Sequence, residues 1–151
     1  MNIHYAIHEF MATNLITFSP ETPIETAIDT FLTQKISGAP VVNSEGSLVG
    51  ILSEKDCMRT LFEASYYNNL GGYVKEYMST EVTTIDVNET LSNVADSFLN
   101  SRFRRFPILE GDKLVGQISR RDVLRAIHHL SKEEQSSDRK STRLNSSHTS
   151  I

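Results

Sequence analysis

The sequence of 151 residues consists of two similar halves. Residues 10–56 and 77–122 align at a constant offset of 67 positions as far as Pro40 and Pro107, and at 66 positions after one deletion in the next turn. A duplication at a fixed period indicates a supersecondary unit that occurs twice, and so short a unit buries little apolar surface alone. The fold must therefore be assembled from two packed copies of one unit.

Each half begins with the signals of an amphipathic helix. Thr22, Pro23 and Glu25 suit an N-cap, a first helical residue and the closing residue of a capping box. Apolar residues then recur with helical spacing over 24–32. The same stripe returns over 91–99, where Asn88 is the candidate cap. We expect a half-buried helix in each half.

Short apolar runs separated by turn-forming residues follow and precede these helices. A second helix is expected to begin after Ser53 in the first half and after Ser119 in the second. The predicted order in each half is β-α-β-β-α, an α/β fold. The runs predict two hairpins and a further strand ahead of each first helix: 39–42 with 48–52, 106–109 with 114–118, and single strands at 15–18 and 82–87.

Composition limits the classes of function. The formal net charge of −4 argues against a general nucleic-acid binder, because such binding needs many lysine and arginine contacts with phosphates. The single cysteine, Cys57, excludes an intrachain disulfide and suits a reducing compartment. No segment approaches the roughly 20 apolar residues of a membrane span or shows a secretory signal. We expect a cytoplasmic protein with neither a membrane nor a nucleic acid as its partner.

The most specific motif lies between the second hairpin strand and the next helix. A glycine is followed three positions later by Ser53 and then Asp56, and the second half repeats this spacing with Ser119 and Asp122. Ser-x-x-Asp is a capping-box pattern, which requires no ligand. The same carboxylate could also accept both hydroxyls of a vicinal diol, as in a ribose. Both interpretations remain open.

Because both halves carry this motif together with the central proline, residues 10–130 resemble a tandem pair of cystathionine-β-synthase (CBS) domains. The resemblance implies an α/β fold of two β-α-β-β-α CBS repeats in a pseudo-two-fold arrangement, called a Bateman-type module, with the sheets packed face to face and the helices outside. It also implies an adenosine-containing ligand in a cleft between the repeats, a homodimer, and a separate regulated protein as the partner.

The resemblance implies a set of ligand-binding residues. Ser53, Asp56, Ser119 and Asp122 would hold the ribose. Thr17 and Thr84 would approach the base or the phosphates. The remaining expected residues flank the proline or the serine–aspartate pair of each repeat: Ser37, Gly38, Ala39, Pro40, Lys55, Arg104, Arg105, Phe106, Pro107, Arg120 and Arg121.

The expected organisation is a lead segment (1–9), a first CBS repeat (10–65), a connector (66–76), a second CBS repeat (77–130) and a polar, disordered tail (131–151). From about residue 138 the tail resembles the translation of a sequencing adapter. We therefore leave this part of the tail out of the functional interpretation.

Positive charge distinguishes the second repeat. Seven basic and three acidic residues fall between Arg102 and Arg125, whereas residues 10–56 hold two basic and six acidic residues. A solvated basic face is one explanation. Phosphate binding is the other, because Arg104, Arg105 and their neighbours present guanidinium groups that donate parallel pairs of hydrogen bonds. We favour AMP, ADP or ATP over an uncharged adenosine derivative.

Other chemistry has little support in the sequence. His4 with His8, and His128 with His129, lack the further ligands of a closed metal site. Cys57 has no histidine base implied beside it, and no phosphate loop is present. We expect no metal, no resident cofactor and no enzyme activity. A sensor of adenine nucleotides is the leading hypothesis, and a structural or dimerisation module with vestigial clefts is the alternative.

Overall fold

The computed structural model describes residues 7–67 and 71–145. The chain forms two compact units that do not follow the two halves of the sequence. We call the first the α5 unit, which contains Met1–Met11, Asn88–Phe106 and Ile118–Ile151. The second is the α1 unit, which contains Ala12–Val87 and Pro107–Gln117. Each unit therefore combines segments from both repeats.

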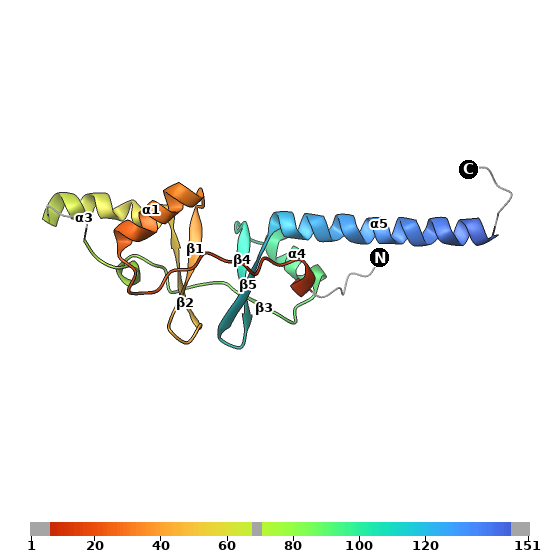
Figure 1. Cartoon of the computed structure of the whole chain (residues 1–151), viewed down its shortest axis with the longest axis horizontal. Coiled ribbons are helices and arrows are strands. Elements are labelled where there is room, and N and C mark those ends of the chain that lie inside the picture. Colours follow the sequence, from red (N-terminus) through yellow and green to blue (C-terminus); the bar gives the residue numbers. More distant parts are fainter. Residues whose placement is uncertain (1–6, 68–70, 146–151) are drawn as a thin grey trace. The chain divides into compact units, whose positions relative to one another are not determined.

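The element order confirms the predicted α/β architecture. In both repeats a helix is followed by a β-hairpin and then by further helix, and a short 3-10 helix lies ahead of each repeat (Figure 1). The elements are η1 (Ile7–Glu9), α1 (Ile24–Gln34), β1 (Gly38–Val42), β2 (Leu48–Ser53), α2 (Glu54–Cys57), α3 (Arg59–Tyr67), η2 (Val74–Glu76), β3 (Ile85–Asp86), α4 (Leu91–Leu99), β4 (Arg105–Glu110), β5 (Lys113–Ser119) and α5 (Arg120–Asn145).

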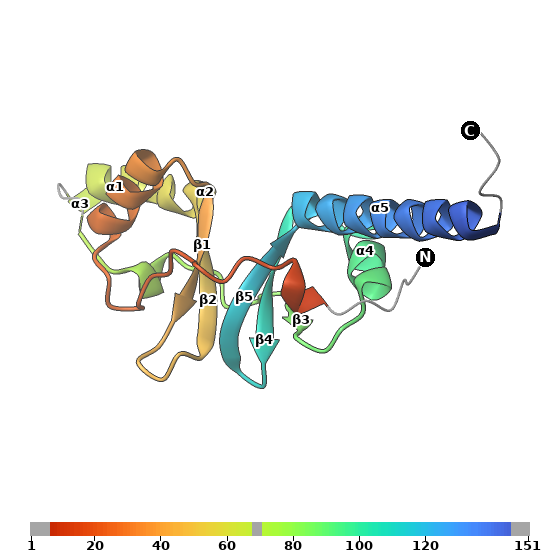
Figure 2. The same ribbon diagram turned by 45° about the vertical axis from the view of Figure 1, so that its right-hand side comes forward.

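The α1 unit is built on the hairpin of β1 and β2. The two strands are antiparallel, with Gly38 opposite Ser53 and a register shift after Val41. Figure 2 shows α1, α2 and α3 gathered at one end of this hairpin. Phe18 and Phe31 pack edge to face in the core, with their ring centroids 5.5 Å apart. The predicted hairpin is confirmed.

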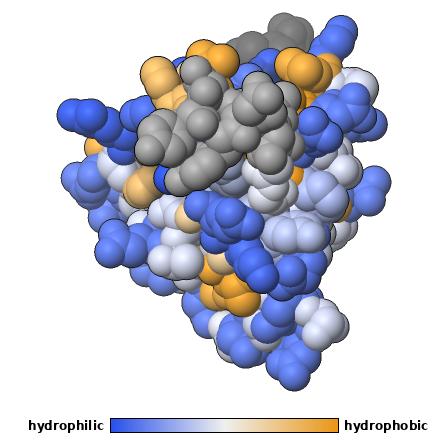
Figure 3. Space-filling model, turned by 90° about the vertical axis from the view of Figure 1, so that its left-hand side faces the viewer, coloured by the Kyte–Doolittle hydropathy of each residue, from blue (hydrophilic) through white to orange (hydrophobic). Residues whose placement is uncertain are grey.

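Part of the outer helical surface of the α1 unit is apolar. Leu32 is 70% exposed and Phe62 is 74% exposed, and Met58 and Leu61 are exposed as well. We call these four residues the apolar face of the α1 unit. Figure 3 looks onto the end of the molecule that carries α1 and α3 and shows hydrophobic residues breaking a mainly hydrophilic surface.

The strand ahead of each first helix is shorter than predicted. In the second repeat only Ile85–Asp86 forms a strand, β3, which runs parallel to β4 in a three-stranded sheet of order β3-β4-β5. In the first repeat, 15–18 contributes a single parallel bridge from Phe18 to Val41. Ser19 and Pro20 end the extension, because the amide of Thr22 turns back onto the Ser19 carbonyl.

The predicted helix caps are wrong in both repeats. Pro23 is the N-cap of α1 and makes no side-chain capping bond, while the Thr22 hydroxyl accepts a hydrogen bond from the Ser19 amide instead. Thr90, not Asn88, caps α4 by accepting from the amide of Asn93. Pro23 and Thr90 occupy the same position of the repeat, so the two helices begin in register with different caps.

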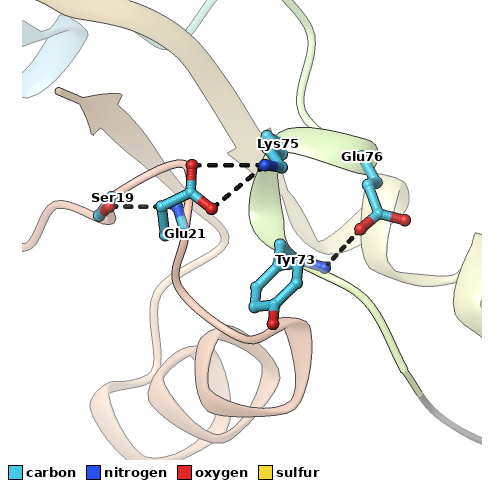
Figure 4. A network of polar contacts seen from close by, with 5 residues as sticks. All are labelled: Ser19, Glu21, Tyr73, Lys75 and Glu76. Atoms are coloured by element: carbon cyan, nitrogen blue, oxygen red, sulfur yellow. Dashed lines mark hydrogen bonds and ion pairs between the residues drawn. The ribbon is translucent and has the colours of Figure 1, made fainter.

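The connector is tied to the loop ahead of α1 (Figure 4). Lys75 Nζ lies 3.2 Å from Glu21 Oε2, and Ser19 Oγ accepts from the Glu21 amide. The Tyr73 amide donates to Glu76 Oε1, and the Val74 amide donates to the Thr22 carbonyl. The segment that leads into the second repeat is therefore part of the structure of the first.

Hydrogen bonds join the tips of the two hairpins within the α1 unit, and we call this group of bonds the hairpin clasp. Ser47 Oγ donates to Asp112 Oδ2 at 2.9 Å, and Lys113 Nζ donates to the Glu45 carbonyl at 2.8 Å. Backbone bonds from Leu48 to Asp112 and from Leu114 to Gly46 complete it. Ser47 is buried there, although it lies in a loop.

The α5 unit packs α4 against α5, and its core includes the buried Phe98 and Phe106, with the half-exposed Phe103 beside Phe106. Phe106 lies 4.6 Å from Phe98 and 5.5 Å from Phe103 between ring centroids. Leu99, Leu124 and Ile127 are exposed and form the apolar face of this unit.

Helix α5 continues to Asn145, whereas the sequence analysis expects a disordered tail from residue 131. The stretch 120–145 contains no glycine or proline that would end the helix. Within the described ranges, no helix is long and apolar enough to cross a membrane.

Candidate functional site

Ser53 and Asp56 form a complete capping box at the start of α2. The Asp56 amide donates to Ser53 Oγ at 3.2 Å, and the Ser53 amide donates to Asp56 Oδ2 at 2.9 Å. The Ser53 hydroxyl also donates to Asp56 Oδ2 at 2.9 Å. The box follows directly from the Ser-x-x-Asp spacing, and the capping interpretation is confirmed.

Ser119 and Asp122 repeat this arrangement at the start of α5. The Asp122 amide donates to Ser119 Oγ at 3.1 Å, and the Ser119 amide and hydroxyl donate to Asp122 Oδ2 at 2.8 and 2.9 Å. In both boxes the serine proton and one carboxylate oxygen are engaged in capping. The serine can therefore meet a ligand only as an acceptor, and the second carboxylate oxygen, Oδ1, is the atom to which a diol would donate.

The α1 unit brings the first-repeat candidates together. The Glu54 amide donates to the Ser37 carbonyl at 2.9 Å, and Gly38 pairs with Ser53 across the hairpin. Ala39 and Pro40 are buried below this junction. Thr17 and Lys55 are exposed, and Thr17 directly precedes the bridge from Phe18 to β1.

The α5 unit brings most of the second-repeat candidates together. The Arg120 amide donates to the Arg104 carbonyl at 3.0 Å, which matches the bond between Glu54 and Ser37. The Arg120 guanidinium turns back and donates to the Phe103 carbonyl at 3.1 Å. Arg104, Arg105 and Arg121 are exposed, and none of them forms an ion pair with another described residue.

The remaining candidates are divided between the units. Phe106 is buried in the core of the α5 unit. Thr84 is half-buried just before β3, and Pro107 is buried in β4, and both belong to the α1 unit. The structure therefore groups Ser119 and Asp122 with the arginines of the second repeat, but places Thr84 and Pro107 in the other unit.

Cys57 is poorly suited to nucleophilic chemistry. Burial, together with the nearby carboxylates of Asp56 and Glu54, raises the pKa of its thiol to about 11. The thiol therefore stays protonated near neutral pH. Metal ligands are not grouped either: among the described residues, no three histidine, cysteine, aspartate or glutamate side chains cluster. His4 lies outside the described residues.

Sequence reasoning missed two arginines beside the capping boxes. Arg59 and Arg125 each follow the box aspartate by three positions. Arg125 pairs with Asp122, whereas Arg59 donates to the carbonyl of Tyr77. The equal spacing in both repeats was a signal available in the sequence, since residues three apart on a helix are neighbours. Their different partners were not, because Tyr77 comes from a distant segment.

Comparison with known proteins identifies the repeats. The family model described as "CBS domain" matches residues 7–63 and 74–129. The chain is 32% identical over 125 residues to MJ1225 of Methanocaldococcus jannaschii; this covers 83% of the chain but only 44% of that protein.

Solved structures show the same fold. The crystal structure of CBSX2 in complex with AMP superposes with a TM-score of 0.73 at 25% identity, covering 84% of this chain and 98% of that one. CBSX2 is a protein of Arabidopsis thaliana. The structure of CbpB in complex with c-di-AMP has a TM-score of 0.77 at 16% identity, covering 89% and 92% of the two chains, and supports the fold alone. The chain belongs to the CBS-domain family and carries two CBS domains in tandem, as its sequence predicts.

Proposed function

We propose that the chain is a regulatory module that binds an adenine nucleotide (AMP, ADP or ATP) through the serine–aspartate pairs of its CBS repeats and signals to a separate partner protein. The observation that carries this proposal is the duplicated capping box. Its aspartate uses Oδ2 for the cap and holds Oδ1 at the helix start, where the diol of a ribose can donate to it.

The electrostatics of the second repeat support a phosphorylated ligand. Arg104, Arg105 and Arg121 present exposed guanidinium groups near Ser119 in sequence and in the same compact unit. Guanidinium groups bind phosphate oxygens in parallel pairs, which an uncharged adenosine derivative could not use. The relative CBSX2 was crystallised with AMP, which supports the same class of ligand.

The proposed contacts follow the roles that the resemblance implies for the ribose, the phosphates and the base. Asp56 and Asp122 are the candidate ribose acceptors. In the α1 unit, which holds Asp56, the base is assigned to the backbone around Ser37 and to Thr17 and Thr84. In the α5 unit, which holds Asp122, the phosphates of a ligand at that aspartate are assigned to Arg104, Arg105 and Arg121. We assign no catalytic step and no resident cofactor to these residues.

We also propose that the chain forms a homodimer through its apolar helical faces. Leu32 and Phe62 in the α1 unit, and Leu99 and Leu124 in the α5 unit, are large hydrophobic residues that are more than half exposed. Exposed apolar surface, where such residues gather, marks interaction sites in soluble proteins. Light scattering after size exclusion should give twice the chain mass, and Leu99→Glu should give a monomer.

Thermal unfolding with AMP, ADP, ATP or S-adenosylmethionine tests the function. A ligand present at about 100 times its Kd stabilises the folded state by about 2.7 kcal/mol, which raises the midpoint by several degrees. The increase should occur with at least one adenine nucleotide and should be lost when both box aspartates are replaced by asparagine. Asp29→Asn, which removes a charge from the exposed side of α1, should keep it.

The alternative function is a structural or dimerisation module with vestigial clefts, and the exposed apolar faces favour it. It predicts no change in the midpoint with any nucleotide at millimolar concentration, together with an intact dimer. That result would contradict the nucleotide-sensor hypothesis and support the structural or dimerisation module.

A further inference from the structure

Arg59 and Arg125 occupy the same position in the two repeats but have different partners. Each lies one helical turn after the aspartate of its capping box, where its side chain can reach the carboxylate. The choice of partner decides whether the outer carboxylate oxygen, Oδ1, remains available. This choice differs between the repeats.

In the first repeat the arginine is drawn away from the aspartate. Arg59 Nη2 donates to the Tyr77 carbonyl at 2.6 Å, and its guanidinium lies 5.4 Å from the centroid of the Tyr77 ring. Asp56 Oδ2 carries the two bonds of the cap, and Oδ1 accepts no hydrogen bond and forms no ion pair with any residue that the structure describes. Asp56 is half-buried, so Oδ1 can still be reached from solvent.

In the second repeat both carboxylate oxygens are occupied. Asp122 Oδ2 carries the cap, and Oδ1 is paired with the guanidinium of Arg125. The Asp122 side chain is 9% exposed, whereas the Arg125 side chain that is paired with it is 62% exposed. A diol that donates two hydroxyls to Oδ1 would first have to displace this guanidinium.

We infer that the arginine three residues after the box determines which repeat accepts a ribose: Asp56 is the open diol acceptor, and Arg125 closes Asp122. The inference rests on the proposed function, because it selects between the two acids that this function offers. Carboxylate capacity supplies the physical reason, since each oxygen has about two acceptor positions and a diol needs two of them. Arg125 is thus a specificity-determining residue.

Calorimetric titration with AMP and with 2′-deoxy-AMP, which lacks the vicinal diol, tests the inference. The wild-type chain should bind AMP at least about tenfold more tightly than the deoxy nucleotide, a difference of about 1.4 kcal/mol. Asp56→Asn should remove this preference, whereas Asp122→Asn should change it less than about twofold. Asparagine keeps an oxygen for the cap, so both variants should fold.

Arg125→Gln is the decisive variant, and Arg59→Gln is its matched control. Opening Asp122 should add a second AMP site per chain that also prefers the diol, and Arg59→Gln should add none. The inference is overturned if Asp122→Asn removes the diol preference while Asp56→Asn keeps it, and the proposed function then stands. If neither the wild-type chain nor any variant binds a nucleotide, the proposed function fails and the inference fails with it.

Discussion

Tyr77 in the α1 unit and Phe10 in the α5 unit occupy the same position in the two repeats. Each is a lead residue of one repeat that packs against a helix of the other. Tyr77 Oη donates to Glu63 Oε2 on α3 at 2.5 Å, whereas the Phe10 ring lies 5.8 Å from the ring of His129 on α5. Glu63 and His129 are themselves equivalent in the duplication.

This pair of contacts shows what the duplication preserved and what it did not. The backbone positions correspond, so the same helix meets the same lead residue in both copies. The interaction changed from a charged hydrogen bond to a ring contact, and the arginine one turn earlier changed its partner as well. The role of a residue in one repeat therefore cannot be transferred to its equivalent without examining the partner.

The largest expected effect tests whether the cores of the α1 unit and the α5 unit contribute equally to the free energy of unfolding. Phe31→Ala and Phe98→Ala each remove a buried ring at the same repeat position, and each should lower the free energy of unfolding by about 3–5 kcal/mol. Urea denaturation followed by circular dichroism measures this loss. Glu25→Ala and Ser92→Ala are matched controls, because these two equivalent side chains are exposed on the same helices and lie outside the apolar faces. If only one of the two substitutions lowers the free energy of unfolding by less than about 1.5 kcal/mol, the core of that unit contributes less to stability than the core of the other.

A smaller effect separates Tyr77 from Phe10. The hydrogen bond to Glu63, together with burial, raises the pKa of Tyr77 to about 12. The folded state therefore holds this proton more tightly than the unfolded chain, whose tyrosine pKa is about 10. The resulting stability is complete below about pH 10 and is lost as the pH rises toward 12.

Tyr77→Phe should lower stability at neutral pH by about 1–2 kcal/mol. It should also remove the step at the highest pH from the titration of the tyrosines followed by ultraviolet absorbance. Glu63→Gln should bring that step to lower pH. Phe10→Leu, which changes the equivalent ring but no phenol, should leave the titration as it is. An unchanged titration in Tyr77→Phe would mean that another tyrosine carries the raised pKa.

The smallest effect concerns the ends of α1 and α4. Lys35 ends α1 in the left-handed conformation, with φ 56° and ψ 47°, whereas α4 ends at Asn100 with φ −99°. Glycine adopts the left-handed region without steric cost, so Lys35→Gly should raise the free energy of unfolding by roughly 0.5 kcal/mol. Arg102→Gly, at the equivalent position, should give no gain, because among the described non-glycine residues only Lys35 has a positive φ.

Local patterns predicted much of the fold. Turn-forming residues between apolar runs predicted both hairpins, and the Ser-x-x-Asp spacing predicted both capping boxes, because these features depend on neighbours within a few positions. The caps at Pro23 and Thr90 were missed because the Thr22 hydroxyl accepts from the Ser19 amide instead of capping α1, and because Thr90 rather than Asn88 accepts from the Asn93 amide. The partners of Arg59 and Arg125 were missed because Tyr77 reaches α3 from 18 positions away.

The candidate site was predicted as a set of residues rather than as an arrangement. Ser53 with Asp56, and Ser119 with Asp122, come together as expected, since each pair spans a single turn. The division of Thr84 and Pro107 from Asp122 follows from the two compact units, which sequence similarity alone does not reveal. The nucleotide and its contacts stay a prediction for the experiments above.

The hairpin clasp has a consequence for synthesis. Residues 12–87 leave the ribosome first, but the α1 unit also needs 107–117, which supply Asp112 and Lys113 to the loop around Ser47. Domains commonly fold as they emerge from the N-terminus. The α1 unit instead cannot complete its folding until residues 107–117 of the second repeat have been translated. A gene that lost its second copy would therefore leave the first one unfinished, which gives the duplication a structural reason to persist.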